Sequence, residues 1–106
     1  MRLTIYHTND IHSHLHAYTR ITAYLQATRP TLTHASRYVD IGDHVDLSLP
    51  VTEGTLGKRN IELLNEAGCD VATIGNNEGM TISHEALNTL YDDATFKVTC
   101  TNVLDE

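Results

Sequence analysis

The chain has 106 residues, of which 41% are hydrophobic, and its 14 acidic and 7 basic side chains give a formal net charge of −7 at pH 7. This length, without any compositionally biased segment, predicts one soluble globular unit with room for a single core. The basic residues are scattered, so no cationic face is expected to neutralise a phosphate backbone, which argues against binding of a nucleic acid polymer.

The sequence shows no sign of a membrane segment or a leader. No stretch approaches about 18 uninterrupted apolar residues, and the first residues lack the charged and apolar regions of a signal peptide. We therefore expect no membrane association and a cytoplasmic location. Cys69 and Cys100 lie in segments expected to be buried, which favours reduced packing residues over a disulfide.

The first two predicted elements are a strand and a helix. Residues 3–8 (LTIYHT) alternate apolar and polar side chains and are rich in β-branched residues, which predicts a strand ending near Asn9. Over 17–28 the apolar side chains recur at helical spacing, and Pro30 follows where a helix must have stopped. The stretch HTNDIHSHLH places four histidines around Asp10 at the end of this strand. It indicates a polar loop between a strand and a helix, not a terminal purification tag.

The downstream segments continue this alternation of strands and helices. A strand is predicted at 37–41, where it runs into Gly42, and a loop that contains Pro50 follows it as far as Leu56. The next helix is marked by apolar residues at helical spacing and is ended by Gly68; these residues are Leu56, Ile61, Leu64 and Ala67. A strand at 70–74 and a strand at 96–100 enclose a helix that begins at Ser83 and carries Leu87, Leu90, Tyr91 and Ala94.

The order β-α-β-α-β-α-β predicts an α/β fold with a parallel sheet of about four strands. In such a sheet, every strand delivers its following loop to the same edge. Asp10 and His12 follow the first predicted strand, Asp43 the second and Asn76 the third, so we expect these side chains to converge. Neighbouring strands lie about 4.8 Å apart and paired catalytic metals about 3.5–4 Å apart, so adjacent strand ends suit a site for two metals.

Three motifs, HTNDIHSH, DIGDH and TIGNNE, occur in this order, each at the end of a predicted strand. Together they resemble the first three motifs of the calcineurin-like metallophosphoesterases, specifically the 5′-nucleotidase group, and the similarity continues to TCTNV near the end of the chain. The resemblance implies the first half of a four-layer α/β/β/α sandwich. Residues 1–106 would then be the N-terminal portion of a phosphoesterase domain whose C-terminal part is absent.

The resemblance also implies a metal-dependent phosphoester hydrolase that acts on a phosphorylated small molecule: a nucleotide, a cyclic nucleotide or a sugar nucleotide. Asp10 and His12 would hold the first of two divalent ions, Asp43 would bridge both, and Asn76 would bind the second through its amide oxygen. Such ligands suit Mn, Zn or Fe. A hydroxide activated by the ions would attack phosphorus in line.

One departure from the family concerns proton delivery. In most of the family the residue after Asn76 is a histidine that protonates the leaving oxygen, whereas here it is Asn77. Asn77 can donate a hydrogen bond at this catalytic position but cannot act as a general acid. We therefore expect a preference for good leaving groups, or a proton supplied by His14 or His44.

A second departure concerns the later ligands. The family's Gly-His-x-His segment does not occur among these 106 residues, so both ions would lack ligands and this fragment alone is expected to have little activity. In the family a second sheet covers the first. We therefore expect an uncovered apolar sheet face, and a homo-oligomer formed through it.

Two alternatives stay open. DIHSHLH also resembles the Asp-x-His-x-His strand end of amidohydrolases and PHP-type phosphatases, in which His12 and His14 would bind metal at the mouth of a barrel with more strands than are expected here. Alternatively, the chain is a catalytically inert metal-binding or interaction module. Glu78 is a candidate support for the ligands, and Asp40 a candidate to orient a neighbouring loop.

Overall fold

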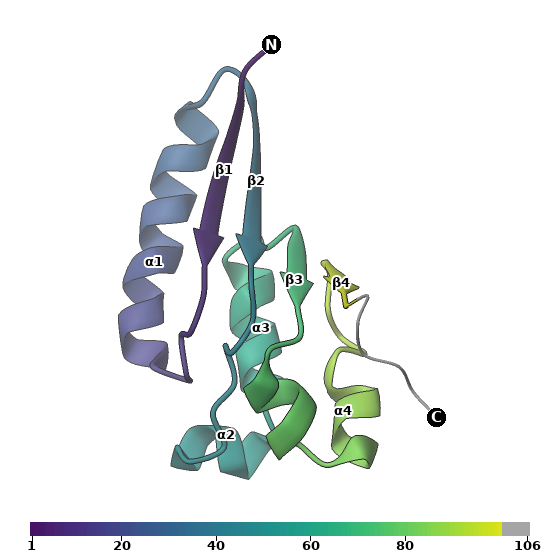
Figure 1. Cartoon of the computed structure of the whole chain (residues 1–106). Coiled ribbons are helices and arrows are strands. Elements are labelled where there is room, and N and C mark those ends of the chain that lie inside the picture. Colours follow the sequence, from purple (N-terminus) through teal and green to yellow (C-terminus); the bar gives the residue numbers. More distant parts are fainter. Residues whose placement is uncertain (101–106) are drawn as a thin grey trace.

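A parallel β-sheet organises residues 1–100, the part of the chain that this computed structural model describes (Figure 1). The elements are β1 (Leu3–Thr8), α1 (Leu15–Thr28), β2 (Ala35–Asp40), α2 (Pro50–Thr55), α3 (Lys58–Glu66), β3 (Val71–Thr73), α4 (His84–Leu90) and β4 (Lys97–Thr99), with a 3₁₀ turn at Arg29–Thr31 and a π-helical turn at Asn77–Thr81.

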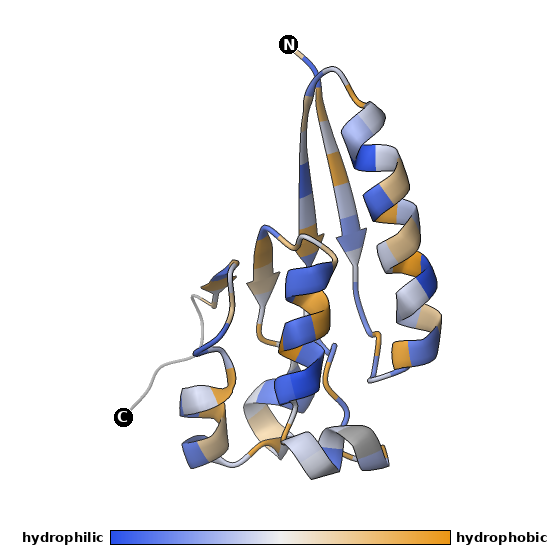
Figure 2. Ribbon diagram, turned by 180° about the vertical axis from the view of Figure 1, so that it is seen from behind, coloured by the Kyte–Doolittle hydropathy of each residue, from blue (hydrophilic) through white to orange (hydrophobic). Residues whose placement is uncertain are grey.

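The sheet has the strand order β1-β2-β3-β4, and each neighbouring pair is parallel. This confirms the predicted α/β fold with its parallel sheet. Right-handed crossovers between successive neighbours place the connecting helices on one face, and the two opposite views show α1 and α3 together on one side of the sheet (Figures 1 and 2). The carboxyl ends of β1, β2 and β3 point the same way, so the loops that follow them meet at one edge.

The hydrophobic core lies between the sheet and these helices. Tyr38 and Ala72 face it from the sheet, and Tyr18 and Ile61 from α1 and α3. Cys69 is buried in the same core, as expected for a packing residue. The core fixes the sheet against the helices and so sets where the strand ends lie.

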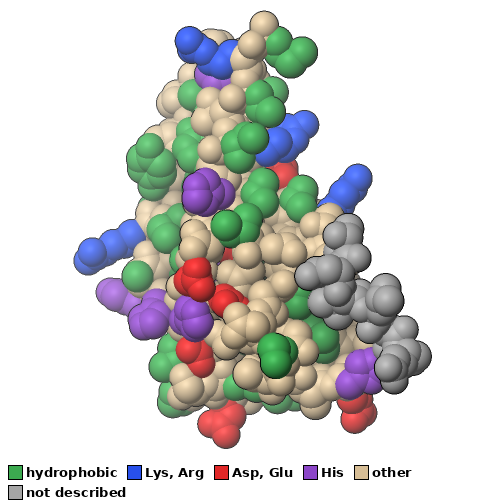
Figure 3. Space-filling model, in the orientation of Figure 1, with side chains coloured by type: hydrophobic (Ala, Val, Ile, Leu, Met, Phe, Trp, Pro, Cys, Tyr) green, Lys and Arg blue, Asp and Glu red, His purple; other side chains and the backbone are tan. Residues whose placement is uncertain are grey.

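The opposite face of the sheet has no layer over it among residues 1–100. Leu3 and Ile5 on β1 are 50% and 59% exposed, and Ile41, just after β2, is 50% exposed. Figure 3 shows hydrophobic side chains running down this face along the strands. The structure therefore has the uncovered apolar face that was expected. His7 is exposed on the same side of the sheet.

The structure differs from the sequence prediction around the second helix. Pro50 does not lie in a loop but begins α2, because the fixed φ of proline suits a first helical turn. Leu56 ends that helix in a left-handed conformation (φ 52°) and is 55% exposed, so it is not part of the next helix. After Gly57, α3 begins at Lys58, and Gly68 ends it with φ 74° as predicted.

The last elements are shorter than predicted. Ser83 begins α4 as expected, since its hydroxyl accepts a hydrogen bond from the Ala86 N–H at 3.2 Å, but the helix ends at Leu90 and leaves Tyr91 and Ala94 outside it. The TCTNV segment continues past residue 100 and so lies partly outside the described residues. None of the helices within residues 1–100 has the length and apolar character needed to cross a membrane.

Candidate metal centre

The loops that follow β1 and β2 run side by side beyond the ends of their strands. The backbone N–H of Asp10 donates to the carbonyl of Gly42 at 3.0 Å, and the N–H of His12 donates to the carbonyl of Asp43 at 2.9 Å. The N–H of Ser13 donates in the same way to the carbonyl of His44 at 2.8 Å. These bonds hold the first loop firmly against the second.

The backbone of both loops adopts an uncommon conformation at the predicted ligands. Asp10, His12 and Asp43 all have positive φ, at 56°, 49° and 56°. Such conformations cost on the order of 1–3 kcal/mol outside glycine, although Asp and His tolerate them better than most residues. They concentrate at functional sites because surrounding structure must enforce them, which here is the bonding between the two loops.

The three side chains on these residues meet at one place. One potential ligand atom from each of Asp10, His12 and Asp43 lies within 4.8 Å of the other two, and His12 Nε2 is 3.4 Å from Asp10 Oδ1. Among residues 1–100, these three side chains form a group of His, Asp, Glu or Cys residues spaced closely enough to hold a metal ion. Figure 3 shows acidic and histidine side chains gathered below the strand ends.

Asn76 joins the cluster from the loop after β3. With its amide nitrogen toward Asp43, the side chain donates to Oδ2 at 2.8 Å and to Oδ1 at 3.3 Å. With the amide turned the other way, its oxygen faces the same carboxylate, an arrangement that a cation between the oxygens would stabilise. The four side chains predicted to converge therefore do converge.

The donor set suits a divalent cation. Two carboxylates, an imidazole and an amide oxygen are all common ligands of Mn, Zn and Fe. These four side chains fit one ion. Two ions would need more donors than Asp10, His12, Asp43 and Asn76 supply, in agreement with the expected shortage of ligands.

Glu78 locks the second loop to the third. Its carboxylate, 1% exposed, accepts hydrogen bonds from the backbone N–H groups of Asp43, His44, Val45 and Gly75 at 2.8–3.1 Å. Four converging donors replace the water that a buried carboxylate would otherwise need. Glu78 thus fixes the backbone that carries Asp43, the supporting role for which it was a candidate.

Two glycines permit the close approach of these loops. Gly42 has φ 104°, and a Cβ added there would lie 2.9 Å from the Cα of Gly75. A Cβ added to Gly75 would lie 2.8 Å from Cγ of Asp43. Only residues without a side chain fit between the loops, because any larger residue would push Asp43 away.

Asp40 connects the first two loops from below. It is 1% exposed, and it accepts hydrogen bonds from the Gly42 N–H at 3.1 Å and from the Thr8 hydroxyl at 2.6 Å. Burial raises the pKa of Asp40 to about 6. These contacts agree with the expectation that Asp40 orients a neighbouring loop.

The exposed part of the cluster is electrostatically suited to bind a cation. The hydrogen bond from Asn9, at 2.5 Å, lowers the pKa of Asp10. Desolvation lowers the pKa of His12, but its contacts with Asp46 and Asp10 outweigh this effect and raise the pKa overall. Metal binding requires a deprotonated carboxylate, and Asp10 meets this requirement at neutral pH.

Asn77 lies beside the cluster but faces His12. Its side-chain nitrogen is 2.8 Å from Nδ1 of His12, and its backbone N–H donates to Oδ1 of Asp43 at 2.8 Å. Asn77 therefore contacts two of the candidate ligands, His12 through its side chain and Asp43 through its backbone.

The two other candidate proton donors differ in position. His44 is 2% exposed, packs edge-on against the Tyr18 ring at 4.7 Å, and has a pKa that burial lowers to about 4. A buried imidazole that is neutral at pH 7 is poorly placed to deliver a proton to a substrate, so this position does not favour His44 as the acid. His14 is exposed at the start of α1, with Nδ1 2.9 Å from the Ile11 carbonyl, and is not among the three clustered side chains. This placement does not favour a PHP-type pair with His12.

Asp46 was not predicted as a site residue, yet its Oδ2 lies 3.2 Å from His12 Nδ1. The available signal was its position three residues after Asp43 in the same loop. Nor was a buried polar group predicted around Ser13, whose hydroxyl accepts hydrogen bonds from Thr52, Asn60 and the Asp46 N–H. These contacts come from separate elements, so no local pattern indicates them.

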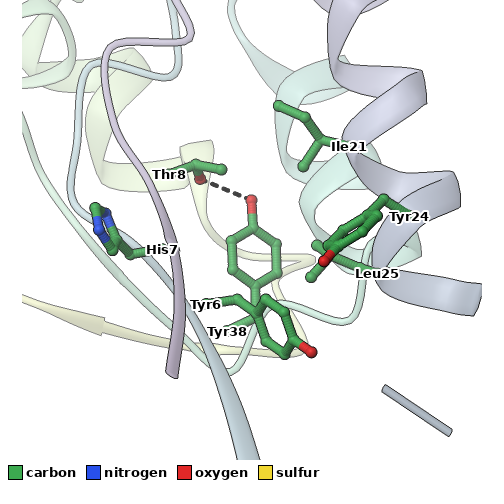
Figure 4. A pocket seen from close by; sticks show the side chains of 7 residues that line it. All are labelled: Tyr6, His7, Thr8, Ile21, Tyr24, Leu25 and Tyr38. Carbon is green, nitrogen blue, oxygen red and sulfur yellow. Dashed lines mark hydrogen bonds between the residues drawn. The ribbon is translucent and has the colours of Figure 1, made fainter. Parts of the chain in front are cut away.

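A separate pocket of about 240 Å³ lies between α1 and β1 (Figure 4). It is lined by Tyr6, His7, Thr8, Ile21, Tyr24, Leu25 and Tyr38. A hydrogen bond of 2.7 Å joins the Thr8 and Tyr38 hydroxyls, while His7 points away from the tyrosines across β1. The lining is mainly aromatic and aliphatic and includes none of the clustered ligands.

The chain is similar in sequence to a known bacterial protein. No family model matches the chain. Over 110 aligned residues the chain is 46% identical to a Bacillus subtilis (strain 168) protein described as "Uncharacterized metallophosphoesterase YunD", and the match covers 99% of this chain. The chain spans 23% of the length of that relative. The similarity supports the metallophosphoesterase superfamily, in agreement with the motifs at the strand ends.

Proposed function

We propose that the full-length protein is a metal-dependent phosphoester hydrolase of the metallophosphoesterase superfamily, and that residues 1–106 supply the N-terminal part of its catalytic domain. The similarity to a metallophosphoesterase supports the superfamily. The observation that carries the proposal is the cluster of Asp10, His12 and Asp43, held on left-handed backbone by two paired loops with ligand atoms within 4.8 Å of one another.

In this proposal Asp10, His12, Asp43 and Asn76 would hold two divalent ions together with further donors from the rest of the full-length protein, and Asp43 would serve both ions. When bound, the ions supply positive charge to the phosphoryl oxygens and activate water. The chain's own contribution is to hold the ligands in place. Glu78 fixes the backbone of the loop that carries Asp43 through backbone N–H groups.

The substrate class we propose is a nucleotide, a cyclic nucleotide or a sugar nucleotide, on the resemblance of the three motifs to the 5′-nucleotidase group. The acidic net charge of the chain is also consistent with a substrate that is a phosphorylated small molecule and not a polymer. The net charge of −7 argues against a polyanionic partner, whereas bound divalent ions would attract a single phosphate group locally.

The test is hydrolysis by the full-length protein of nucleoside monophosphates, cyclic nucleotides and sugar nucleotides with Mn²⁺, Zn²⁺ or Fe²⁺. We expect phosphate release that Asp43→Asn abolishes and Asp92→Asn, an exposed acid outside the cluster, leaves unchanged. Metal binding without turnover of any substrate would instead favour the inert module. Loss of activity on His14→Ala equal to that on His12→Ala would favour the PHP-type site.

Asn77 leads to a more specific expectation. Without a general acid at this position, proton delivery to a poor leaving group is lost, an effect of about 10²–10⁴-fold. We expect Asn77→His to accelerate hydrolysis of alkyl phosphate esters by a factor in this range and to change nitrophenyl esters little. Equal acceleration of both ester classes would contradict this role, and metal affinity measured on the same variant controls for the contact of Asn77 with His12.

A further inference from the structure

The imidazole of His12 has a carboxylate at each of its two nitrogens. Nε2 lies 3.4 Å from Asp10 Oδ1, on the side of the clustered ligands, and Nδ1 lies 3.2 Å from Oδ2 of Asp46. The ring thus stands between an acid that belongs to the candidate metal centre and one that does not.

A neutral imidazole binds a metal through the nitrogen that carries no proton, so the other nitrogen must carry it. The hydrogen-bond partner of that second nitrogen sets the tautomer and the orientation of the ring. For His12 to offer Nε2 to a cation beside Asp10, the proton must be on Nδ1, which requires an acceptor there.

We propose that Asp46 is a positioning residue for His12: its carboxylate accepts a hydrogen bond from Nδ1–H and thereby leaves the Nε2 lone pair facing Asp10 and Asp43. The inference rests on the proposed metal centre. It adds to that centre a residue that is not one of its four expected ligands.

Asp46 is held by contacts of its own. Oδ1 accepts hydrogen bonds from the Ser48 N–H at 2.9 Å and the Ser48 hydroxyl at 2.6 Å, and the Asp46 N–H donates to the Ser13 hydroxyl at 2.8 Å. Ser13 is itself buried in the polar group with Thr52 and Asn60. One oxygen of Asp46 is therefore fixed by the loop, and Oδ2 is directed to His12.

Asn77 competes for the same nitrogen. Its amide nitrogen lies 2.8 Å from His12 Nδ1, and a donor there would force the proton to Nε2, the tautomer that cannot bind a metal through that atom. The carboxylate of Asp46 is the stronger partner because a charged acceptor forms a stronger hydrogen bond than a neutral amide. If the Asn77 amide turned its oxygen toward the ring, this oxygen would accept a hydrogen bond from Nδ1–H and the competition would end.

The first test reads the tautomer directly. Long-range ¹H–¹⁵N NMR spectra of the metal-free 106-residue chain, at a pH where His12 is neutral, should show the proton on Nδ1. In Asp46→Leu, which removes the acceptor, the Nε2–H tautomer should dominate. Ser48→Ala deletes one contact of the other oxygen of Asp46 and should leave the wild-type tautomer unchanged. A proton on Nε2 in the wild type, or an unchanged tautomer in folded Asp46→Leu, would overturn the proposal.

The second test separates this inference from the metal centre. In a zinc titration of the same chains, we expect Asp46→Leu to bind zinc about 10–100-fold more weakly than the wild type, the usual effect of losing such a partner, and Ser48→Ala to bind as the wild type does. Equal zinc affinity in the wild type and Asp46→Leu would reject the role of Asp46 and leave the centre intact. Absence of zinc binding in the wild type would count against the centre, while the NMR spectra would still decide the His12–Asp46 contact.

Discussion

At the scale of single residues, the position of Asp43 depends on a carboxylate that never reaches the surface. Glu78 is 1% exposed and accepts hydrogen bonds from backbone N–H groups of the loop that contains Asp43 and from the Gly75 N–H of the next loop. A buried ionised group is tolerated only where such donors surround it. The geometry of the loop that carries Asp43 therefore depends on the hydrogen bonds to Glu78.

We expect Glu78→Gln to lower the free energy of unfolding by about 1–3 kcal/mol, because one amide oxygen replaces two acceptor oxygens and the amide NH₂ meets backbone donors. Urea unfolding of the chain measures this change. Glu85→Gln, at an exposed position in α4, is the matched control and should unfold as the wild type does. If both variants have the same stability, the hydrogen bonds of Glu78 do not hold the loop.

Asp40 and His44 are both buried, and their shifted pKa values lead us to expect an unusual response of the metal-free chain to acid. Burial raises the pKa of Asp40 from 3.8 to about 6, so the folded state takes up this proton first and gains stability as pH falls through that window. Burial lowers the pKa of His44 from 6.5 to about 4, so the unfolded state takes up that proton first and the folded state loses stability over nearly the same range. The two effects oppose each other.

Asp40→Asn removes the gain in stability that comes from protonation of Asp40 as pH falls. Between pH 7 and pH 4 we expect its free energy of unfolding to fall more steeply than that of the wild type, by at most about 3 kcal/mol, the equivalent of about two pKa units. Urea unfolding at several pH values with a chelator present gives the comparison. Parallel curves for the two chains would show that Asp40 does not take up a proton early.

The candidate ligands were readable from the sequence because Asp10, His12, Asp43 and Asn76 stand just after strands of a parallel sheet, and topology alone brings such residues together. The residues that hydrogen-bond to these ligands could not be predicted from the sequence. The contact between Asp46 and His12 depends on the positive φ of His12, and that conformation results from pairing with a loop about thirty residues away.

At the scale of elements, the loops after β2 and β3 touch through Gly42 and Gly75. A methyl group on Gly75 would meet the side chain and backbone of Asp43, whereas a methyl group on Gly54 in α2 would have nothing within 4 Å. A side chain is therefore sterically excluded at Gly75 and sterically allowed at Gly54.

Gly75→Ala should displace the Asp43 carboxylate and so weaken the binding of divalent ions as well as reduce stability. Gly54→Ala should raise stability by about 0.5–1 kcal/mol, because alanine loses less conformational freedom than glycine in a helix, and should leave ion binding unchanged. Titration calorimetry with Mn²⁺, together with urea unfolding, reports both effects. Undiminished ion binding in Gly75→Ala would contradict the close approach of the loops.

The elements with strong periodicity were predicted well, and the short ones were not. β1 and α1 carry clear alternation and helical spacing, and the structure contains both. The six residues of α2 begin at Pro50, a residue type that is also typical of loops, and this segment was predicted as a loop. The π-helical turn at Asn77–Thr81 was missed because the hydrogen bonds that Glu78 makes to another loop shape it, and these are tertiary contacts.

At the scale of the whole molecule, the described residues form a sheet with helices on one face and exposed apolar side chains on the other (Figures 2 and 3). Leu3 and Ile5 are at least half exposed on β1, the edge strand. An apolar face of this kind favours contact with another surface in water. For the 106-residue chain by itself, we propose that a second copy provides that surface.

Light scattering should therefore show the isolated chain larger than a monomer of 11.8 kDa. Ile5→Lys places a charge on the exposed face and should shift the chain toward the monomer. Met80→Lys alters a side chain that is more exposed, at 83%, but lies outside the sheet, and should change nothing. A monodisperse wild-type monomer would contradict association through this face.

The most direct test of the metal centre is titration of the metal-free chain with Mn²⁺ in a calorimeter. The loops after three different strands are held together around Asp43, so the wild type and Asp92→Asn should bind the ion with equal affinity, and Asp43→Asn should lose binding. Absence of binding by the wild type, or unchanged binding by Asp43→Asn, would contradict a cation site at the strand ends.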